Sequence, residues 1–201
     1  VNAGLLQFLA RSAAESGLDE HRDRALALRE TLLNRYLEPT DSLFFAGYAS
    51  FLDPKGRRVR DPSYYASWNA MAVSGLAELF RLVGDPRVLS AARSVMRSVL
   101  REMRSSNGGI LHSPGQGKDV PFLLEDQALV ARASLDLYSV GGQREDFRLA
   151  AELADFMLNR FKDESGALRD RFPETGSPHL PTVDRLVPSG NGVAVQVLLR
   201  L

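Results

Sequence analysis

Hydrophobic residues recur at intervals of three and four positions along most of the chain, which is the period of an α-helix that packs against a core by one face. The clearest stretches run from Trp68 to Val83 and from Val88 to Met103. Between them, Gly84 suits a left-handed helix end, Asp85 can cap the next helix, and Pro86 fits a first helical turn. The pattern therefore predicts a tight helical hairpin.

The same period predicts further helices in both directions. Their expected ranges are 5–13, 25–36, 128–140, 147–161 and 192–201. The turn Gly17–Asp19 separates the first two, and Gly141 with Gly142 separates the third from the fourth. Residues 128–140 are apolar almost all round, so we expect that helix to be buried on more than one side.

The hairpins are internal repeats. A shift of about 67 positions places Asn2 on Asn69 and Gly17 on Gly84, and a shift of about 58 places Asn69 on Gln127. A shift of about 64 places Gln127 on Asn191. Because several matches agree at each offset, we expect an all-α array in which neighbouring helix pairs share a core.

Each second helix is followed by a short apolar segment and a long loop. The apolar segments, 43–48, 109–112 and 166–172, are expected to form small strands or extended connections. The loops, 50–62, 113–122 and 173–188, are rich in proline, glycine and charge. Long loops on one side of a repeat array are where binding sites usually lie.

Composition narrows the functional classes. The 201 residues are 44% hydrophobic and carry 25 basic and 25 acidic side chains, as in an ordinary soluble globular protein without a basic footprint for nucleic acid. The absence of cysteine excludes disulfides, thiol catalysis and zinc–thiolate sites. No segment reaches the run of about 20 apolar residues that spans a membrane. We therefore expect a cytoplasmic protein without nucleic-acid or membrane partners.

Four short motifs resemble a known family. Their sequences are Ser67-Trp68-Asn69-Ala70-Met71, Leu82-Val83-Gly84-Asp85-Pro86, Leu124-Glu125-Asp126-Gln127-Ala128 and Pro188-Ser189-Gly190-Asn191. In this order they resemble the C-terminal part of the thioredoxin-domain-containing, spermatogenesis-associated protein family, over residues 40–201.

The resemblance implies a partial (α/α)6 toroid of antiparallel helical hairpins, similar to six-hairpin glycosidases and sugar 2-epimerases. Residues 1–201 would form one all-α segment of a longer chain, with about three hairpins and the start of a fourth. A thioredoxin-like domain would precede it and be its partner, and the open edges of the ring would allow self-association. One departure argues against an enzyme, because residues 44–50 lack an acidic stretch found in many relatives.

Glu125 and Asp126 are the candidate catalytic residues, since glycoside hydrolysis uses two carboxyl groups across the scissile bond. Adjacent helical residues point about 100° apart, however, so they do not form an evident pair. The favoured alternative is that both carboxylates cap the positive end of their own helix. Asp61 and Asp184 lie in adjoining loops and could supply a distant partner carboxylate.

The candidate substrate-binding residues lie at the same end of the predicted helices. They are Tyr65, Trp68, Asn69, His112, Ser189 and Asn191. Aromatic rings and an amide suit a sugar, and His112 or His179 could act as an acid or base. The alternatives are that Trp68 fills the core, that the recurring amide bonds a preceding loop, that Ser189 caps a helix, and that the histidines have no catalytic role.

We therefore expect a toroid module with a carbohydrate-binding or carbohydrate-active site at the loop mouth. If it is an enzyme, the activity would be glycosidase-like or sugar-epimerase-like, with a sugar ligand and neither a cofactor nor a metal. The alternative is a non-catalytic interaction or structural module associated with the thioredoxin-like domain. A helical scaffold for peptides is less favoured, because the spacing varies between repeats.

Overall fold

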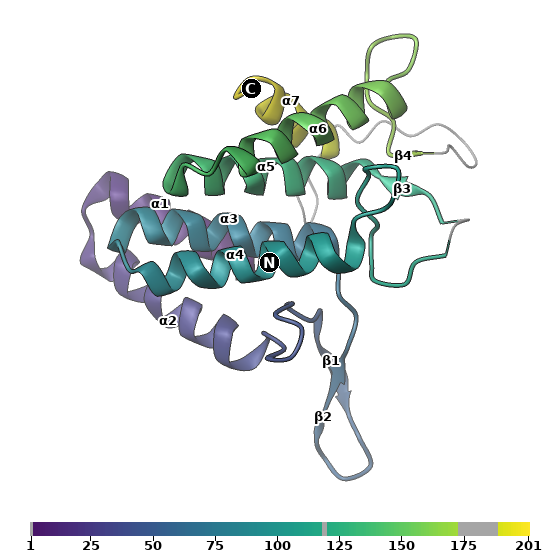
Figure 1. Ribbon diagram of the computed structural model, residues 1–201. Helices are drawn as coiled ribbons and strands as arrows, with labels where there is room; N and C mark the ends of the chain where they lie inside the picture. Colours follow the sequence, from purple (N-terminus) through teal and green to yellow (C-terminus); the bar gives the residue numbers. More distant parts are fainter. Residues whose placement is uncertain (1, 118–119, 173–188) are drawn as a thin grey trace.

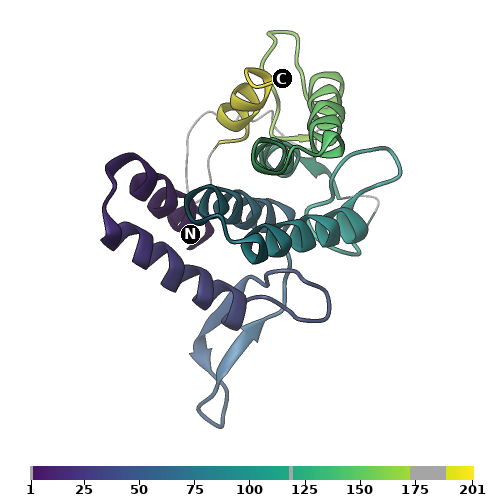
Figure 2. The same ribbon diagram turned by 60° about the vertical axis from the view of Figure 1, so that its left-hand side comes forward.

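The computed structural model describes residues 2–117, 120–172 and 189–201, and over these ranges the chain is mostly helical, as predicted (Figure 1). The helices are α1 (Asn2–Ser16), α2 (Asp19–Arg35), α3 (Ala66–Val83), α4 (Pro86–Met103), α5 (Leu124–Gly141), α6 (Arg144–Arg160) and α7 (Gly190–Leu198). Helices α1, α3, α5 and α7 pack side by side in that order. Figure 2 shows these four inner helices on an arc, with α2, α4 and α6 on its outer side.

The hairpin turns form as their sequences predict. Gly84 and Gly142 end α3 and α5 in the left-handed conformation, each with φ 67°, which suits a residue without a Cβ atom. Asp85 then caps α4 by accepting a hydrogen bond from the backbone amide of Arg87 at 2.9 Å. Helix α5 packs against α3, α6 and α7, which explains why its apolar residues extend around most of its circumference.

The short apolar segments after the outer helices form isolated antiparallel bridges. They pair Leu37 with Phe44, Arg104 with Ile110, and Lys162 with Leu168. Two further strand pairs lie nearby: β1 (Gly47–Leu52) with β2 (Arg58–Asp61), and β3 (Phe122–Leu123) with β4 (Arg171–Phe172). The prediction of a loop at residues 50–62 is thus wrong in part, because β1 and β2 form a hairpin that projects from the helices in Figure 1.

Buried side-chain amides fasten these bridges to the inner helices. The Oδ1 atom of Asn69 accepts from the Phe44 amide at 2.7 Å, and its Nδ2 donates to the carbonyls of Phe44 and Tyr65 at 3.0 Å each. Gln127 makes the same bonds to Ile110 at 2.7 and 2.8 Å and to Leu123 at 3.0 Å.

The third copy of this arrangement is at α7, where Asn191 bonds both backbone groups of Leu168 at 3.1 and 2.7 Å. The amide is therefore a structural residue at Asn69, Gln127 and Asn191, which confirms the favoured interpretation of the sequence pattern for these three repeats. Because an amide side chain both donates and accepts, it can satisfy both polar groups of a buried backbone segment.

The two helices at the ends of the arc expose apolar side chains. On α1, Leu5 and Phe8 are 44% and 63% exposed, and at α7 Val195 and Leu199 are 54% and 82% exposed. Such edges fit a segment of a toroid that shares its core only between neighbouring pairs. None of the described helices combines the length and apolar character needed to cross a bilayer.

Candidate functional site

The structure brings together six of the predicted site residues where the N-terminal ends of α3 and α5 approach the segment that follows α4: Tyr65, Trp68, Asn69, His112, Glu125 and Asp126. Gly109 lets this segment lie against α6, because a Cβ atom there would come within 2.5 Å of the Phe156 ring. Two residues after the bridge at Ile110, the carbonyl of His112 accepts a hydrogen bond from the Ala66 amide at 3.0 Å. The backbone of His112 is therefore fixed to the first residue of α3.

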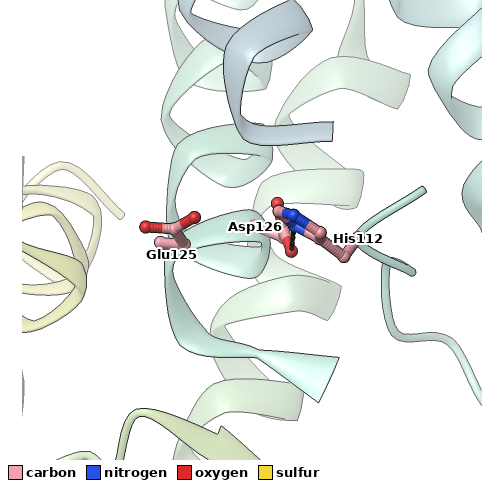
Figure 3. A group of neighbouring side chains, drawn as sticks. All are labelled: His112, Glu125 and Asp126. Carbon is pink, nitrogen blue, oxygen red and sulfur yellow. Dashed lines mark hydrogen bonds and ion pairs between the residues drawn. The ribbon is translucent and has the colours of Figure 1, made fainter. Parts of the chain in front are cut away.

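Asp126 is fully buried and connects α3 to His112. Its Oδ1 atom accepts from the backbone amide of Ser67 at 3.0 Å, and its Oδ2 atom lies 2.9 Å from Nδ1 of His112 (Figure 3). The expectation that Asp126 serves the start of its own helix is thus incomplete, because its hydrogen bonds go to a neighbouring helix. No side-chain cap is formed at Leu123, the residue before α5.

Burial and their mutual hydrogen bond shift the pKa values of His112 and Asp126. The hydrogen bond that the ring donates to Asp126 raises the pKa of His112 above its ordinary value of 6.5, against the opposing effect of burial. Burial raises the pKa of Asp126, and its hydrogen bond with His112 opposes that rise. Each group therefore influences the protonation of the other.

Glu125 lies next to the pair and is half-buried. Its pKa is raised from 4.5 mainly by burial, and then by the negative charges of Asp126 and Asp170. Its Oε1 atom is 3.5 Å from Oγ of Ser67. In Figure 3 the Glu125 side chain extends to the other side of the helix start from His112. A carboxyl group with a raised pKa is a stronger base once ionised than an exposed one.

The donor atoms of His112, Glu125 and Asp126 lie within 4.8 Å of one another, a spacing that a metal ion could use. Both oxygens of Asp126 already bond protein groups, however, and Nδ1 of His112 faces one of them. A metal would have to displace these hydrogen bonds, so the arrangement fits proton transfer better than metal binding.

Two aromatic side chains border the pair. The Tyr65 ring lies 4.8 Å from the His112 ring, and 4.9 Å from the Trp68 ring in an edge-on contact. Trp68 is 42% exposed, so the interpretation that it fills the core is wrong. It also lines an apolar hollow of about 290 Å³ with Phe45 and Tyr36. Together Tyr65 and Trp68, whose rings meet edge to face, offer aromatic surface beside a polar cluster, as sugar sites do.

Three residues predicted to bind substrate have structural roles instead. Asn69 is fully buried and its amide is occupied by backbone groups, and Asn191 makes the equivalent bonds to Leu168. Ser189 is buried and caps α7 by accepting from the Gly192 amide at 3.2 Å. These contacts argue against the substrate-binding assignment of all three. His179 and Asp184 lie outside the described residues.

Sequence reasoning overlooked two residues of the cluster, Ser67 and Asp170. The repeat contained a signal for both, because the shift of 58 positions that relates Asn69 to Gln127 also relates Ser67 to Glu125 and His112 to Asp170. The carbonyl of Asp170 accepts from the Leu124 amide at 2.8 Å, as the His112 carbonyl does from Ala66. Equivalent positions of adjacent repeats therefore converge on one cluster.

No protein-family model matches the chain, and no curated protein matches it in sequence. Among solved structures, it is similar to a sugar epimerase from a ruminal bacterium, with a TM-score of 0.73, 13% identity and coverage of 97% of this chain and 51% of the other. It is similar to an unsaturated glucuronyl hydrolase specific for heparin, with a TM-score of 0.73, 14% identity and coverage of 100% and 58%.

The cellobiose 2-epimerase of Bacillus thermoamylovorans gives a TM-score of 0.71 at 15% identity, with coverage of 85% and 47%. The chain thus spans about half the length of these structures. At such identities the likeness concerns the fold, and all three are carbohydrate-active enzymes by name. The chain has the (α/α)-toroid fold of six-hairpin glycosidases and sugar epimerases.

Proposed function

We propose that the cluster at the starts of α3 and α5 is a carbohydrate-active site that works by proton transfer, in the manner of a sugar epimerase. The observation that carries the proposal is the 2.9 Å contact between His112 and the fully buried carboxyl group of Asp126. This contact fixes Nδ1 of the ring, and within the described ranges Nε2 has no hydrogen-bond partner and would face the ligand. A histidine oriented by a buried acid is a common acid–base device.

The shifted pKa values assign the roles. The hydrogen bond with Asp126 raises the pKa of His112 and so favours its charged form, and burial raises the pKa of Glu125 and so makes its carboxylate a stronger base once ionised. Glu125 would then accept the proton from a carbon next to a sugar carbonyl, and Nε2 of His112 would donate to the carbonyl oxygen. Asp126 is a positioning residue, since it acts through His112.

Hydrolysis by Glu125 and Asp126 as a carboxyl pair has less support. That chemistry needs two carboxyl groups that both reach the substrate, about 5 to 9.5 Å apart. Asp126 is fully buried and both its oxygens are engaged within the protein. Asp170 is half-buried and contributes negative charge at Glu125, so it is the better candidate for a second carboxylate if hydrolysis occurs.

The test is exchange of carbon-bound hydrogen. The protein is incubated in heavy water with a panel of reducing mono- and disaccharides, and deuterium incorporation beside the carbonyl is followed by NMR. We expect incorporation with at least one sugar, and a loss of about 100-fold or more in Glu125→Gln and His112→Asn. His21→Asn is the matched control, because His21 lies on α2 and bonds Ser12.

Aryl glycosides in the same panel test hydrolysis, with Asp170→Asn as its diagnostic variant. The family resemblance supplies the alternative proposal, a non-catalytic module that accompanies a thioredoxin-like domain. That alternative predicts neither deuterium exchange nor glycoside hydrolysis. It also predicts that no sugar changes the melting temperature. This set of results would remove the carbohydrate proposal.

A further inference from the structure

Apart from the cluster of His112 and Asp126, the inner helices form a polar hollow of about 690 Å³ farther along their length. Its charged lining comprises Arg11, Glu15, Glu78, Arg81, Arg132, Asp136 and Arg200. These side chains come from the inner helices and from the end of the chain after α7, and none belongs to an outer helix. The hollow therefore lies on the inner side of the arc seen in Figure 2.

The repeat explains most of these charges. Shifts of 67, 58 and 64 positions relate Arg11, Glu78, Asp136 and Arg200, which are thus equivalent residues of four inner helices or their ends. They pair across neighbours, Arg11 with Glu78 at 3.5 Å and Arg200 with Asp136 at 2.7 Å. At this repeat position the opposite charges of adjacent repeats therefore neutralise one another.

Arg81 is also accounted for by its surroundings. Its Nε atom lies 3.8 Å from Glu78, and its NH2 group donates to Oγ of Ser139 at 2.9 Å. Glu15, the remaining acid of the hollow, is exposed to solvent. Glu78 and Asp136 therefore serve three of the four arginines, and the fourth arginine supplies an excess positive charge.

That fourth residue is Arg132, at the position equivalent to Gln7, Ser74 and Gln196. Uncharged polar residues occupy the other three repeats, so the guanidinium is particular to α5. Its Nε atom is buried and has no hydrogen-bond partner within the part of the chain that the structure describes. Burial and the nearby charges of Arg200 and Arg11 lower the pKa of Arg132, whereas Asp136 opposes that effect.

Asp136 does not fully satisfy Arg132. It lies one helical turn farther along α5, and one of its oxygens is bonded to Arg200 while the other is buried without a partner among the described residues. Arg132 is partly exposed and its buried Nε atom lacks an acceptor among the described residues, and an oxyanion can supply two acceptors to its planar fork.

We propose that Arg132 anchors a small oxyanion, a carboxylate or a phosphate group, in this hollow, with Arg11 and Arg200 contributing to the positive potential. The site is separate from the acid–base cluster, because Arg132 follows Glu125 by seven residues, or about 10 Å along α5. The inference does not rest on the proposed sugar chemistry.

The experiment is a titration of the protein with inorganic phosphate, and separately with acetate, at constant ionic strength set by chloride. The Nε–Hε NMR resonance of Arg132 is assigned by its disappearance in Arg132→Gln. We expect this resonance to shift saturably with at least one anion. A shift with phosphate indicates a phosphate ligand, and a shift with acetate indicates a carboxylate ligand. Arg132→Lys should bind at least about tenfold more weakly, because it loses the planar fork.

Thermal unfolding provides a second readout. Phosphate should raise the melting temperature of the wild-type protein and of Arg144→Gln, a control on the exposed start of α6, by several degrees more than that of Arg132→Gln. Equal phosphate effects in wild type and Arg132→Gln would reflect general exclusion of the salt and overturn the proposal, as would an unchanged Arg132 resonance.

Discussion

Helices α3 and α5 begin with the same backbone contacts but carry different side chains beside them. Asn69 and Gln127 occupy equivalent places and make equivalent bonds to a bridge residue and to the residue before the helix. One position earlier, α3 has the exposed Trp68 and α5 has the fully buried Asp126. The amide at Asn69 and Gln127 maintains the repeat. The residue before it, Trp68 in α3 and Asp126 in α5, differs between the helices and forms part of the candidate site.

The comparison extends to the segments that meet these helices. The carbonyl of His112 accepts from the first residue of α3, as that of Asp170 does from α5, so the backbone plan is shared. Of these two segments, the one that meets α3 places its side chain, His112, against a buried carboxyl group, that of Asp126. A repeat protein can thus gain chemistry at one junction by changing one or two side chains while the scaffold remains.

The largest effect should follow removal of the common amides. Asn69→Ala and Gln127→Ala should each lower the free energy of unfolding by about 3 kcal/mol, because each leaves buried backbone groups unpaired. Urea denaturation measures both values. Asn159→Ala, on the exposed face of α6, should change stability by less than about 0.5 kcal/mol. A large difference between Asn69→Ala and Gln127→Ala would contradict their equivalence.

Substitutions at Asp126 and Trp68, the equivalent positions at which α5 and α3 differ, should lower the free energy of unfolding by smaller and unequal amounts. Asp126→Ala should cost about 2 kcal/mol, since it strands the Ser67 amide and releases His112, whereas Trp68→Ala should cost about 1 kcal/mol. The same denaturation experiment compares them. If Trp68→Ala proved the more destabilising of the two, Trp68 would be a core residue despite its exposure.

The glycines that end α3 and α5 test whether the two hairpins close in the same way, with an expected change of about 1 kcal/mol in the free energy of unfolding. Gly84→Ala and Gly142→Ala should each destabilise the protein by about that amount, because both residues have φ near 67° and a Cβ atom is disfavoured there. Gly117→Ala, at an exposed glycine with open space around its Cα atom, serves as the control. Unequal costs at the two helix ends would show that the two hairpins close differently.

The smallest effect concerns pH. Because the folded-state pKa of His112 is raised above 6.5, its contribution to stability is present below that pH and is lost as the pH rises through the folded-state value. The stability difference between wild type and His112→Asn should therefore shrink between about pH 5.5 and about pH 8.5. Denaturation at the two pH values measures it, and a difference that grows with pH would reverse the assigned sign.

Much of this architecture was predictable from sequence. Gly84, Asp85 and Pro86 signal a helical hairpin by local chemistry alone, and the amide positions reveal the repeat because one structural task recurs in each copy. The role of Trp68 was not predictable, since a tryptophan on a helical apolar stripe looks like a core residue. The bond between Asp126 and the start of α3 depends on how two helices pack, which spacing along one helix does not show. His112 was recognised as a candidate, but its partner was not.

The central claim is that a buried carboxyl group at the start of α5 orients and charges His112. The direct measurement is an NMR titration of the His112 ring in wild type and in Asp126→Asn, with Glu125→Gln as a control that retains the contact. We expect a pKa above 6.5 in wild type that falls clearly in Asp126→Asn and changes less in Glu125→Gln. A wild-type value at or below 6.5 that Asp126→Asn leaves unchanged would contradict the claim.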